Sequence, residues 1–220
     1  MKPVIIVNFK TYEKATGKKA LKLAEKIYEH TKNSKSKWII CPQHVDIWIA
    51  KHVKIPVYAQ HVDALEPGRG TGYITPFSLK AYGVKGSLIN HSEHRLPLKE
   101  IKARIEILKK YNMVSVVCAN TVREASMLAK LKPDYIAVEP PELIGSGISV
   151  SEAKPEIIEK SAKVVKKQGV KFLCGAGISK GEDVKKALEL GADGVLVASA
   201  IANSKNPVKV IKDFIRGAEL

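Results

Sequence analysis

Short apolar runs alternate with segments of helical period along the whole chain, and this alternation is the strongest constraint on its fold. Between the runs, apolar residues recur at steps of three and four, as at Leu98, Ile101, Ile105 and Leu108, which is typical of amphipathic helices. The runs themselves are rich in Val and Ile and predict eight buried strands: Val4–Val7, Trp38–Cys41, Val57–Gln60, Ser87–Asn90, Val114–Cys118, Tyr135–Glu139, Lys171–Cys174 and Gly194–Ala198.

Eight strands that alternate with helices favour parallel pairing through helical crossovers. Closing such a sheet into a (β/α)8 barrel removes both edges, and 220 residues is near the lower limit of about 200 for that architecture. Some helices must then be short, as at Val45–His52 and Pro76–Tyr82. An open doubly wound sheet is the alternative, but no Gly-rich dinucleotide turn follows the first strand. We therefore expect a single (β/α)8 barrel domain over residues 1–220.

Local signals mark the ends of several helices. Thr75–Pro76 offers a cap followed by proline at the first helical position. The segments Thr121–Glu124 and Ser179–Glu182 each have the spacing of a capping box. Gly191 is a favourable stop for the helix that precedes the last strand.

Composition limits the cellular setting and the classes of partner. No stretch approaches the roughly 18 to 20 apolar residues of a membrane span, and the N-terminus lacks the organisation of a signal peptide. The three cysteines, Cys41, Cys118 and Cys174, lie far apart in or beside apolar runs, which favours buried free thiols in a reducing compartment. We expect a cytoplasmic protein.

The net charge of +15 and the pI near 9.6 have two interpretations. One is a surface for nucleic acid or another polyanion. The other is a solvated, lysine-rich exterior that attracts small anionic metabolites. The lysines are spread over nearly every helical segment, and no RNA-binding signature or zinc-finger spacing is present. We favour the solvated exterior and expect no nucleic-acid or membrane partner.

Polar residues gather where the expected strands end. In a parallel barrel these ends meet at one face, which carries the chemistry. Lys10, His91 and Glu139 each follow a different strand, and small residues follow the last two strands at Gly175–Gly177 and Ala198–Ala200. Small residues let backbone N–H groups approach an anion. Each residue alone has an ordinary structural explanation; their joint placement predicts a site for a phosphate-bearing substrate.

A loop suited to act as a lid follows Glu139. A carboxylate at the mouth of a buried strand is costly unless it has a use there. The loop is stiff at its entry and hinged at its exit, which suits closure over a reacting substrate. The expected lid comprises Pro140, Pro141, Glu142, Leu143, Ile144, Gly145, Ser146 and Gly147.

Several motifs in order resemble the triosephosphate isomerase family, most of all its compact archaeal branch. The resemblance spans the chain from the first strand to the last, and its motifs are Asn8-x-Lys10, Asn90-His91-Ser92-Glu93, Val138-Glu139-Pro140 with Ile144-Gly145-Ser146-Gly147, and Asp193-Gly194-Val-Leu-Val197. It implies a barrel enzyme of glycolysis and gluconeogenesis that interconverts dihydroxyacetone phosphate and glyceraldehyde 3-phosphate. It also implies no metal, no organic cofactor and a homodimer or homotetramer.

By matching position, the resemblance gives the site residues their roles. Glu139 would be the base that moves the proton between C1 and C2, and His91 a neutral electrophile that polarises the carbonyl. Lys10 would neutralise the phosphate and the developing enediolate. A Glu base, a neutral His and a closing loop are the arrangement known for this same family. The implied substrate-binding residues are Asn8, Phe9, Lys10, Ile144, Gly177, Ala198 and Ser199.

The chain departs from the common family pattern at the lid and around the phosphate. Cys174 and Gly177 stand where many members carry Tyr and Ser, whose hydroxyls latch the closed lid. Glu142 replaces a usual aromatic residue, and Ala198-Ser199 replaces a glycine pair. These departures leave the latch of the closed lid unidentified.

Four points stay open at the level of sequence. Glu93 is either a partner that supports Lys10, which we favour, or a member of a local pair with Arg95. The stretch Ala64–Tyr73 is either a loop between subunits or a solvent-exposed turn. Another phosphate-binding barrel, such as an aldolase or a different sugar-phosphate isomerase, is an alternative function. A basic nucleic-acid-binding barrel is the other.

Overall fold

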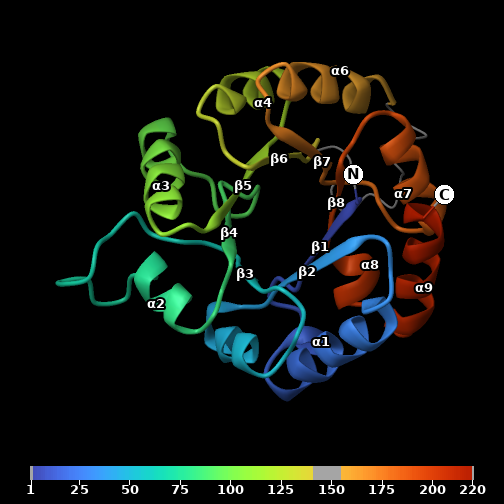
Figure 1. Cartoon of the computed structure of the whole chain (residues 1–220), viewed down its shortest axis with the longest axis horizontal. Coiled ribbons are helices and arrows are strands. Elements are labelled where there is room, and N and C mark those ends of the chain that lie inside the picture. Colours follow the sequence, from blue (N-terminus) through green and yellow to red (C-terminus); the bar gives the residue numbers. More distant parts are fainter. Residues whose placement is uncertain (1, 141–154, 220) are drawn as a thin grey trace.

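The computed structural model describes residues 2–140 and 155–219, and eight strands in this part form a nearly closed parallel barrel within a ring of helices (Figure 1). The strands are β1 Val4–Asn8, β2 Lys37–Cys41, β3 Tyr58–Ala59, β4 Gly86–Ile89, β5 Val114–Ala119, β6 Tyr135–Val138, β7 Lys171–Cys174 and β8 Gly194–Val197. They pair in the order β2-β1-β8-β7-β6-β5-β4-β3. The predicted (β/α)8 fold is confirmed, and the open doubly wound sheet is wrong.

The barrel of strands closes between β2 and β3, where the pairing is shortest. β3 has only two residues, and a single parallel bridge joins Ile40 of β2 to Val57. The Ile40 N–H also donates to the Pro56 carbonyl at 3.1 Å. The predicted strand Val57–Gln60 is therefore only partly regular. Its last residue instead uses its side chain to join neighbouring strands.

Helices follow the strands and cover the outside of the barrel. The α-helices are α1 Lys18–Thr31, α2 Pro76–Ala81, α3 Leu98–Lys110, α4 Val122–Ala129, α6 Pro155–Lys166, α7 Gly181–Glu189, α8 Ser199–Ala202 and α9 Pro207–Ala218, with 3-10 helices η1 Glu13–Ala15 and η2 His44–Lys51. The short segments expected near 45–52 and 76–82 are thus η2, which is a 3-10 helix, and α2. None of the helices in the described part is long and apolar enough to cross a membrane.

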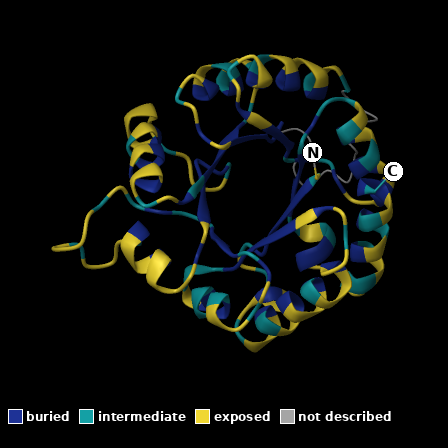
Figure 2. Cartoon of the chain, viewed as in Figure 1, coloured by how far each residue is buried: buried dark blue, intermediate teal, exposed yellow. Residues whose placement is uncertain are grey.

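The strands are buried along almost their whole length, as are the helix faces that look toward them (Figure 2). Their side chains alternate between two apolar layers. On β1, Val4 and Ile6 point into the barrel, where they pack with a buried set from the other strands. Ile5 and Val7 point outward and pack under the helices. A strand with both faces buried needs a continuous apolar run, which is why the strands were recognisable in the sequence.

The helix-end signals were partly right. Thr75 caps α2 and accepts from the Ser78 N–H, with Pro76 at the first position. Thr121 caps α4 and accepts from the Glu124 N–H. After α7 the chain turns at Gly191 with φ +98°, a value that favours glycine.

Two expectations for the helices were wrong in detail. The residue before α7 is Lys180, so the expected box Ser179–Glu182 is displaced by one position. Asp183, buried within the first turn, accepts from the N–H groups of Ser179 and Lys180. On α3 the apolar face begins at Ile101, because Leu98 is exposed at the first helical residue.

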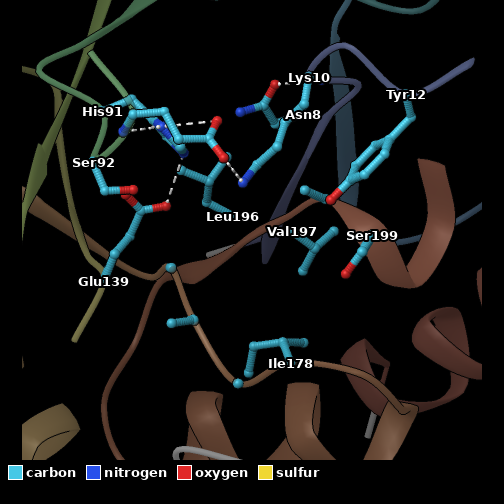
Figure 3. Close-up of a pocket in the computed structure, with 15 residues that line it drawn as sticks. Asn8, Lys10, Tyr12, His91, Ser92, Glu139, Ile178, Leu196, Val197 and Ser199 are labelled. Carbon is cyan, nitrogen blue, oxygen red and sulfur yellow. Dashed lines mark hydrogen bonds and ion pairs between the residues drawn. The ribbon is translucent and has the colours of Figure 1, made fainter. Parts of the chain in front are cut away.

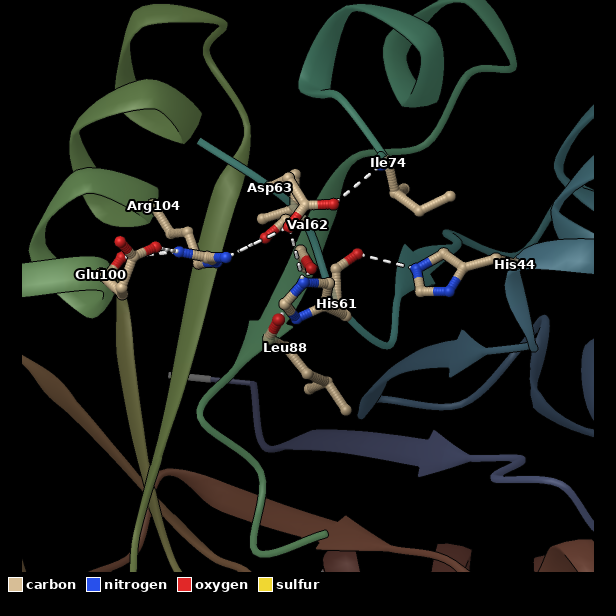
Figure 4. A network of polar contacts seen from close by, with 9 residues as sticks. His44, His61, Val62, Asp63, Ile74, Leu88, Glu100 and Arg104 are labelled. Atoms are coloured by element: carbon tan, nitrogen blue, oxygen red, sulfur yellow. Dashed lines mark hydrogen bonds and ion pairs between the residues drawn. The ribbon is translucent and has the colours of Figure 1, made fainter. Parts of the chain in front are cut away.

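A polar network fixes the loop that follows β3 (Figure 4). Arg104 of α3 is buried and donates to the Val62 carbonyl at 2.7 Å and to Asp63 at 3.1 Å. The Nε2 atom of His61 lies 3.1 Å from the same Asp63 oxygen, and its ring stacks on His94 with centroids 4.2 Å apart. The Nε2 atom of His44 lies 2.8 Å from the His61 carbonyl oxygen. Loops after β2, β3 and β4 are thereby held together.

Candidate active site

A cavity of about 310 Å³ opens at the C-terminal ends of the strands, where parallel barrels carry their chemistry. Lys10, His91 and Glu139 reach it from the ends of β1, β4 and β6 (Figure 3). The residues that line it are Asn8, Lys10, Tyr12, His91, Ser92, Glu93, Glu139, Gly175, Ala176, Gly177, Ile178, Leu196, Val197, Ala198 and Ser199. Of the described residues predicted to act on substrate, only Phe9 is not among them; its side chain is fully buried in the core.

A strained turn presents Lys10 to the cavity. Lys10 has φ +45°, a left-handed value that is uncommon outside glycine and often stored at functional sites. The Asn8 side-chain oxygen accepts from the Lys10 N–H at 3.0 Å. From the end of β3, Gln60 donates to the Lys10 carbonyl at 3.1 Å and to the Cys41 carbonyl at 3.0 Å. These contacts hold the turn in its unfavourable conformation.

Asn90 turns the chain so that His91 faces the cavity. Asn90 has φ +62°, which asparagine tolerates better than most residues. Its side-chain oxygen accepts from the Leu96 N–H at 2.9 Å, and its amide donates to the Cys118 carbonyl at 2.9 Å. The buried asparagine therefore fixes both sides of the turn that carries the imidazole.

A backbone amide determines the tautomer of His91. The Glu93 N–H donates to Nδ1 of His91 at 3.2 Å, so Nδ1 must carry a lone pair and the proton of the neutral ring lies on Nε2. The segment Ser92–Arg95 is not a helix, because α3 begins only at Leu98. A turn closed by the His94 N–H and the His91 carbonyl supplies the amide instead.

Glu139 is a buried carboxylate beside the imidazole. It is 4% exposed, and its Oε1 atom lies 3.3 Å from Nε2 of His91. Its Oε2 atom is buried and has no hydrogen-bond partner in the part of the chain that the structure describes. Burial, with a further contribution from the nearby Glu139 carboxylate, raises the pKa of the Cys118 thiol well above its usual value. A buried carboxylate with an uncommitted oxygen is suited to accept a proton.

Gly175 leaves the space that the Glu139 side chain occupies. A Cβ atom at this position would lie 2.6 Å from Cγ of Glu139 and 3.0 Å from the Val138 carbonyl oxygen. The Gly175 N–H donates to that same carbonyl at 2.9 Å, so the backbones of β6 and β7 are close here. The close approach requires glycine.

Lys10 and Glu93 form an ion pair. The Lys10 ammonium lies 2.7 Å from Oε1 of Glu93, and the other carboxylate oxygen of Glu93 lies 3.7 Å from Nδ1 of His91. Arg95, the alternative partner for Glu93, instead pairs with Glu124. Glu93 is therefore the partner of Lys10 that we favoured from the sequence, and it also lies beside the imidazole.

Small residues form the opposite wall of the cavity. Gly177 has φ +67°, and its N–H and that of Ser199 donate no hydrogen bond to any described residue. Unpaired amides that face a cavity are suited to bind an anion. Of the expected lid, Pro140 is described and buried; residues 141–147, including Ile144, lie outside the described residues.

Sequence reasoning missed Tyr12 and Gln60, and it named Gly175 only as part of a small-residue turn. Gln60 stands at the end of an expected strand, like the three residues that were found, and this signal could have found it. Tyr12 follows Lys10 by two positions, but nothing in its local pattern indicates that it faces the cavity. The role of Gly175 depends on the distance to another strand and has no local signal.

No group of three or more His, Cys, Asp or Glu side chains within residues 2–140 and 155–219 is arranged to hold a metal ion. What the cavity offers is a carboxylate with an uncommitted oxygen, an imidazole whose Nε2 atom lies 3.3 Å from that carboxylate, and an ammonium group. This set can transfer a proton next to a carbonyl group and stabilise the charge that develops on oxygen.

Comparison with known proteins agrees with this chemistry. The family model described as triosephosphate isomerase matches residues 3–214. Three similar proteins carry that name: one from Methanothermus fervidus, 48% identical over 97% of this chain and 98% of its own; one from Methanocaldococcus jannaschii, 48% identical over 97% and 99%; and one from Sulfurisphaera tokodaii, 46% identical over 98% and 95%. The chain therefore belongs to the triosephosphate isomerase family.

Proposed function

We propose that this protein interconverts dihydroxyacetone phosphate and D-glyceraldehyde 3-phosphate through an enediolate. The observation that carries the proposal is the 3.3 Å approach of His91 Nε2 to the Glu139 carboxylate, in a cavity that also contains Lys10. The reaction needs a base at carbon, a proton donor at oxygen and a cation for the phosphate. Membership of the triosephosphate isomerase family supports the same assignment.

Glu139 acts as the base in this proposal. It removes a proton from C1 of dihydroxyacetone phosphate and returns it to C2, which gives the aldose. Its burial supports this role, because a carboxylate shielded from water is a stronger base toward carbon. The uncommitted Oε2 atom supports it as well, since no hydrogen bond among the described residues has to break first.

His91 acts as the electrophile in its neutral form. The proton on Nε2 polarises the substrate carbonyl as C1 loses its proton, and it can then move between the two oxygens of the enediolate. The Glu93 N–H donates to Nδ1, so the ring presents the proton of Nε2 to the substrate. A neutral imidazole matches the basicity of an enediolate better than an imidazolium does.

Lys10 neutralises the charge of the substrate in this scheme. Its ammonium faces the enediolate oxygens and the phosphate, with Asn8 holding the turn and Glu93 holding the side chain. We infer that the amides of Gly177, Ala198 and Ser199 bind the phosphate. These amides lie on the wall opposite the side chains of His91 and Glu139, so the three-carbon chain of the substrate can lie between the two walls. Ile144 and the lid Pro140–Gly147 complete the proposed site.

The Glu139→Gln variant tests the proposed base. Glutamine keeps the shape but cannot accept the proton, so turnover should fall by about two to four powers of ten. The assay couples conversion of glyceraldehyde 3-phosphate to glycerol-3-phosphate dehydrogenase. Glu25→Gln, on the exposed side of α1, is the matched control and should leave turnover unchanged. Wild-type turnover in Glu139→Gln would remove Glu139 as the base.

We also infer that the chain self-associates, as a homodimer or homotetramer. Three large apolar side chains are exposed around a hollow that Trp48 also lines: Val45 at 74%, Tyr73 at 58% and Tyr82 at 41%. Phe77 of α2, next to Ser78 of the same hollow, is 55% exposed. Exposed apolar clusters mark contact surfaces. Tyr73 ends the stretch Ala64–Tyr73, which supports a loop between subunits. Sedimentation that gives the mass of a monomer would contradict this inference.

The cellular role follows from the proposed reaction. We place the enzyme in glycolysis and gluconeogenesis, in the cytoplasm, where the buried free thiols of Cys41, Cys118 and Cys174 remain reduced. Triose phosphates are its small-molecule partners.

A further inference from the structure

Tyr12 lies at the mouth of the active-site cavity and has no assigned role. It belongs to the loop after β1 and lines the same cavity as Gly177, Ala198 and Ser199. In Figure 3 its ring projects toward the end of β8, and its hydroxyl points into the cavity near Ser199. His91 and Glu139 lie on the other side of the view. Tyr12 is therefore on the side where the phosphate of the substrate is expected.

The backbone of Tyr12 is held in place by hydrogen bonds on both sides. Its N–H donates to the Phe9 carbonyl at 3.4 Å, and its own carbonyl accepts from the Ala15 N–H at 2.8 Å and the Thr16 hydroxyl at 2.9 Å. Its ring is half-buried and packs against the main apolar core. A side chain fixed in this way loses little conformational entropy when a ligand binds.

The hydroxyl of Tyr12 has no hydrogen-bond partner among the described residues, although the phenol is partly buried. By comparison, Tyr111, which is also half-buried, donates to Glu66 at 2.6 Å. An unpaired donor that points into a polar cavity is available to a ligand.

A phosphate bound in the cavity would accept a further hydrogen bond. A phosphate has three terminal oxygens, each able to accept more than one hydrogen bond. The only ammonium group that lines the cavity in the described part of the chain is that of Lys10, and it is partly neutralised by Glu93 at 2.7 Å. The Gly177 and Ser199 amides and the Ser199 hydroxyl donate to no described residue, and they are further donors on this side. A neutral hydroxyl adds a donor without adding another charge.

We propose that the Tyr12 hydroxyl donates a hydrogen bond to the phosphate group of the substrate. The proposal rests on the proposed isomerase function for the identity of the substrate, but the anion site itself can be tested without turnover. A hydrogen bond to a charged acceptor changes affinity by about tenfold or more. Tyr12 thus joins the small residues after β7 and β8 in recognising the phosphate.

The Tyr12→Phe variant tests this role, because it removes one oxygen and leaves the ring packing in place. Calorimetry measures the Kd of inorganic phosphate and of 2-phosphoglycolate, and the coupled assay measures KM and kcat for glyceraldehyde 3-phosphate. Both Kd values and KM should rise by about tenfold. The matched control is Tyr28→Phe on α1, a half-buried tyrosine outside the cavity, which should bind both anions as the wild type does.

Turnover of D-glyceraldehyde, which lacks the phosphate, separates recognition from general damage to the site. Its slow conversion should be equal in wild type and Tyr12→Phe. Wild-type Kd values for both anions in Tyr12→Phe would overturn the proposal, as would an equal loss of activity on glyceraldehyde and on glyceraldehyde 3-phosphate. A wild-type protein that binds phosphate through Tyr12 but converts no triose phosphate would refute the isomerase function and leave the anion contact standing.

Discussion

Replacing Gly175 by alanine should displace the proposed base while the fold is kept. The new Cβ would lie 2.6 Å from Cγ of Glu139, whereas ordinary contact begins near 3.4 Å, so the carboxylate has to move by about 0.8 Å. The φ of Gly175 is not in the left-handed region, and alanine therefore adds no backbone strain of that kind. A misplacement of about 1 Å costs about a hundredfold in rate.

We expect kcat of Gly175→Ala to fall by about a hundredfold in the coupled assay, with the Kd of 2-phosphoglycolate changed much less. Gly169→Ala is the control, because it strains the backbone but displaces no neighbouring atom. Gly169 has φ +73° with nothing within 4 Å, so alanine there should cost about 1 to 2 kcal/mol of stability and leave kcat intact. Wild-type kcat in Gly175→Ala would refute the idea that Gly175 keeps the carboxylate in position.

Two further predictions concern charge. In Lys10→Met, kcat/KM should fall by about a thousandfold and inhibition by phosphate should disappear, because Glu93 is left without its cation. The control is Lys14→Met, which loses a contact to the Asn203 carbonyl. Phosphate inhibition retained in Lys10→Met would contradict the prediction. Burial, opposed by the hydrogen bond to Asp63 and assisted by His94, lowers the pKa of His61 below 6.5. The unfolded chain then binds the proton more readily than the folded chain, so the free energy of unfolding should fall as pH drops below about 6.5. Urea unfolding at pH 7.5 and 5.5 should show a smaller loss of stability in His61→Gln than in the wild type. An equal loss in both proteins would contradict the prediction.

The fold could be predicted from the sequence because each strand is buried on both faces. That burial requires short, continuous apolar runs, and each run matched its strand to within one residue at either end. The least regular strand is β3. There Val57 makes only an isolated bridge and Gln60 uses its side chain instead of its backbone. Strand register and helix caps depend on tertiary contacts, which explains why the capping box expected at Ser179 is displaced by one residue.

The main site residues were predictable for a different reason. Lys10, His91 and Glu139 follow separate strands, and a parallel barrel brings strand ends together whatever their distance in sequence. The supporting residues were not predictable in this way. Gly175 matters because of a neighbour on another strand, and Tyr12 because of the direction in which a turn points its ring.

The short pairing between β2 and β3, which we call the seam, connects the stability of the barrel to the position of the Lys10 ammonium group. Gln60 spans this seam, since its amide donates both to the Cys41 carbonyl on β2 and to the Lys10 carbonyl beyond β1. If the ring parts where only Ile40 and Val57 bridge it, the left-handed conformation of Lys10 loses its support. Partial opening under heat or denaturant would then inactivate the protein while most of its helices are still formed.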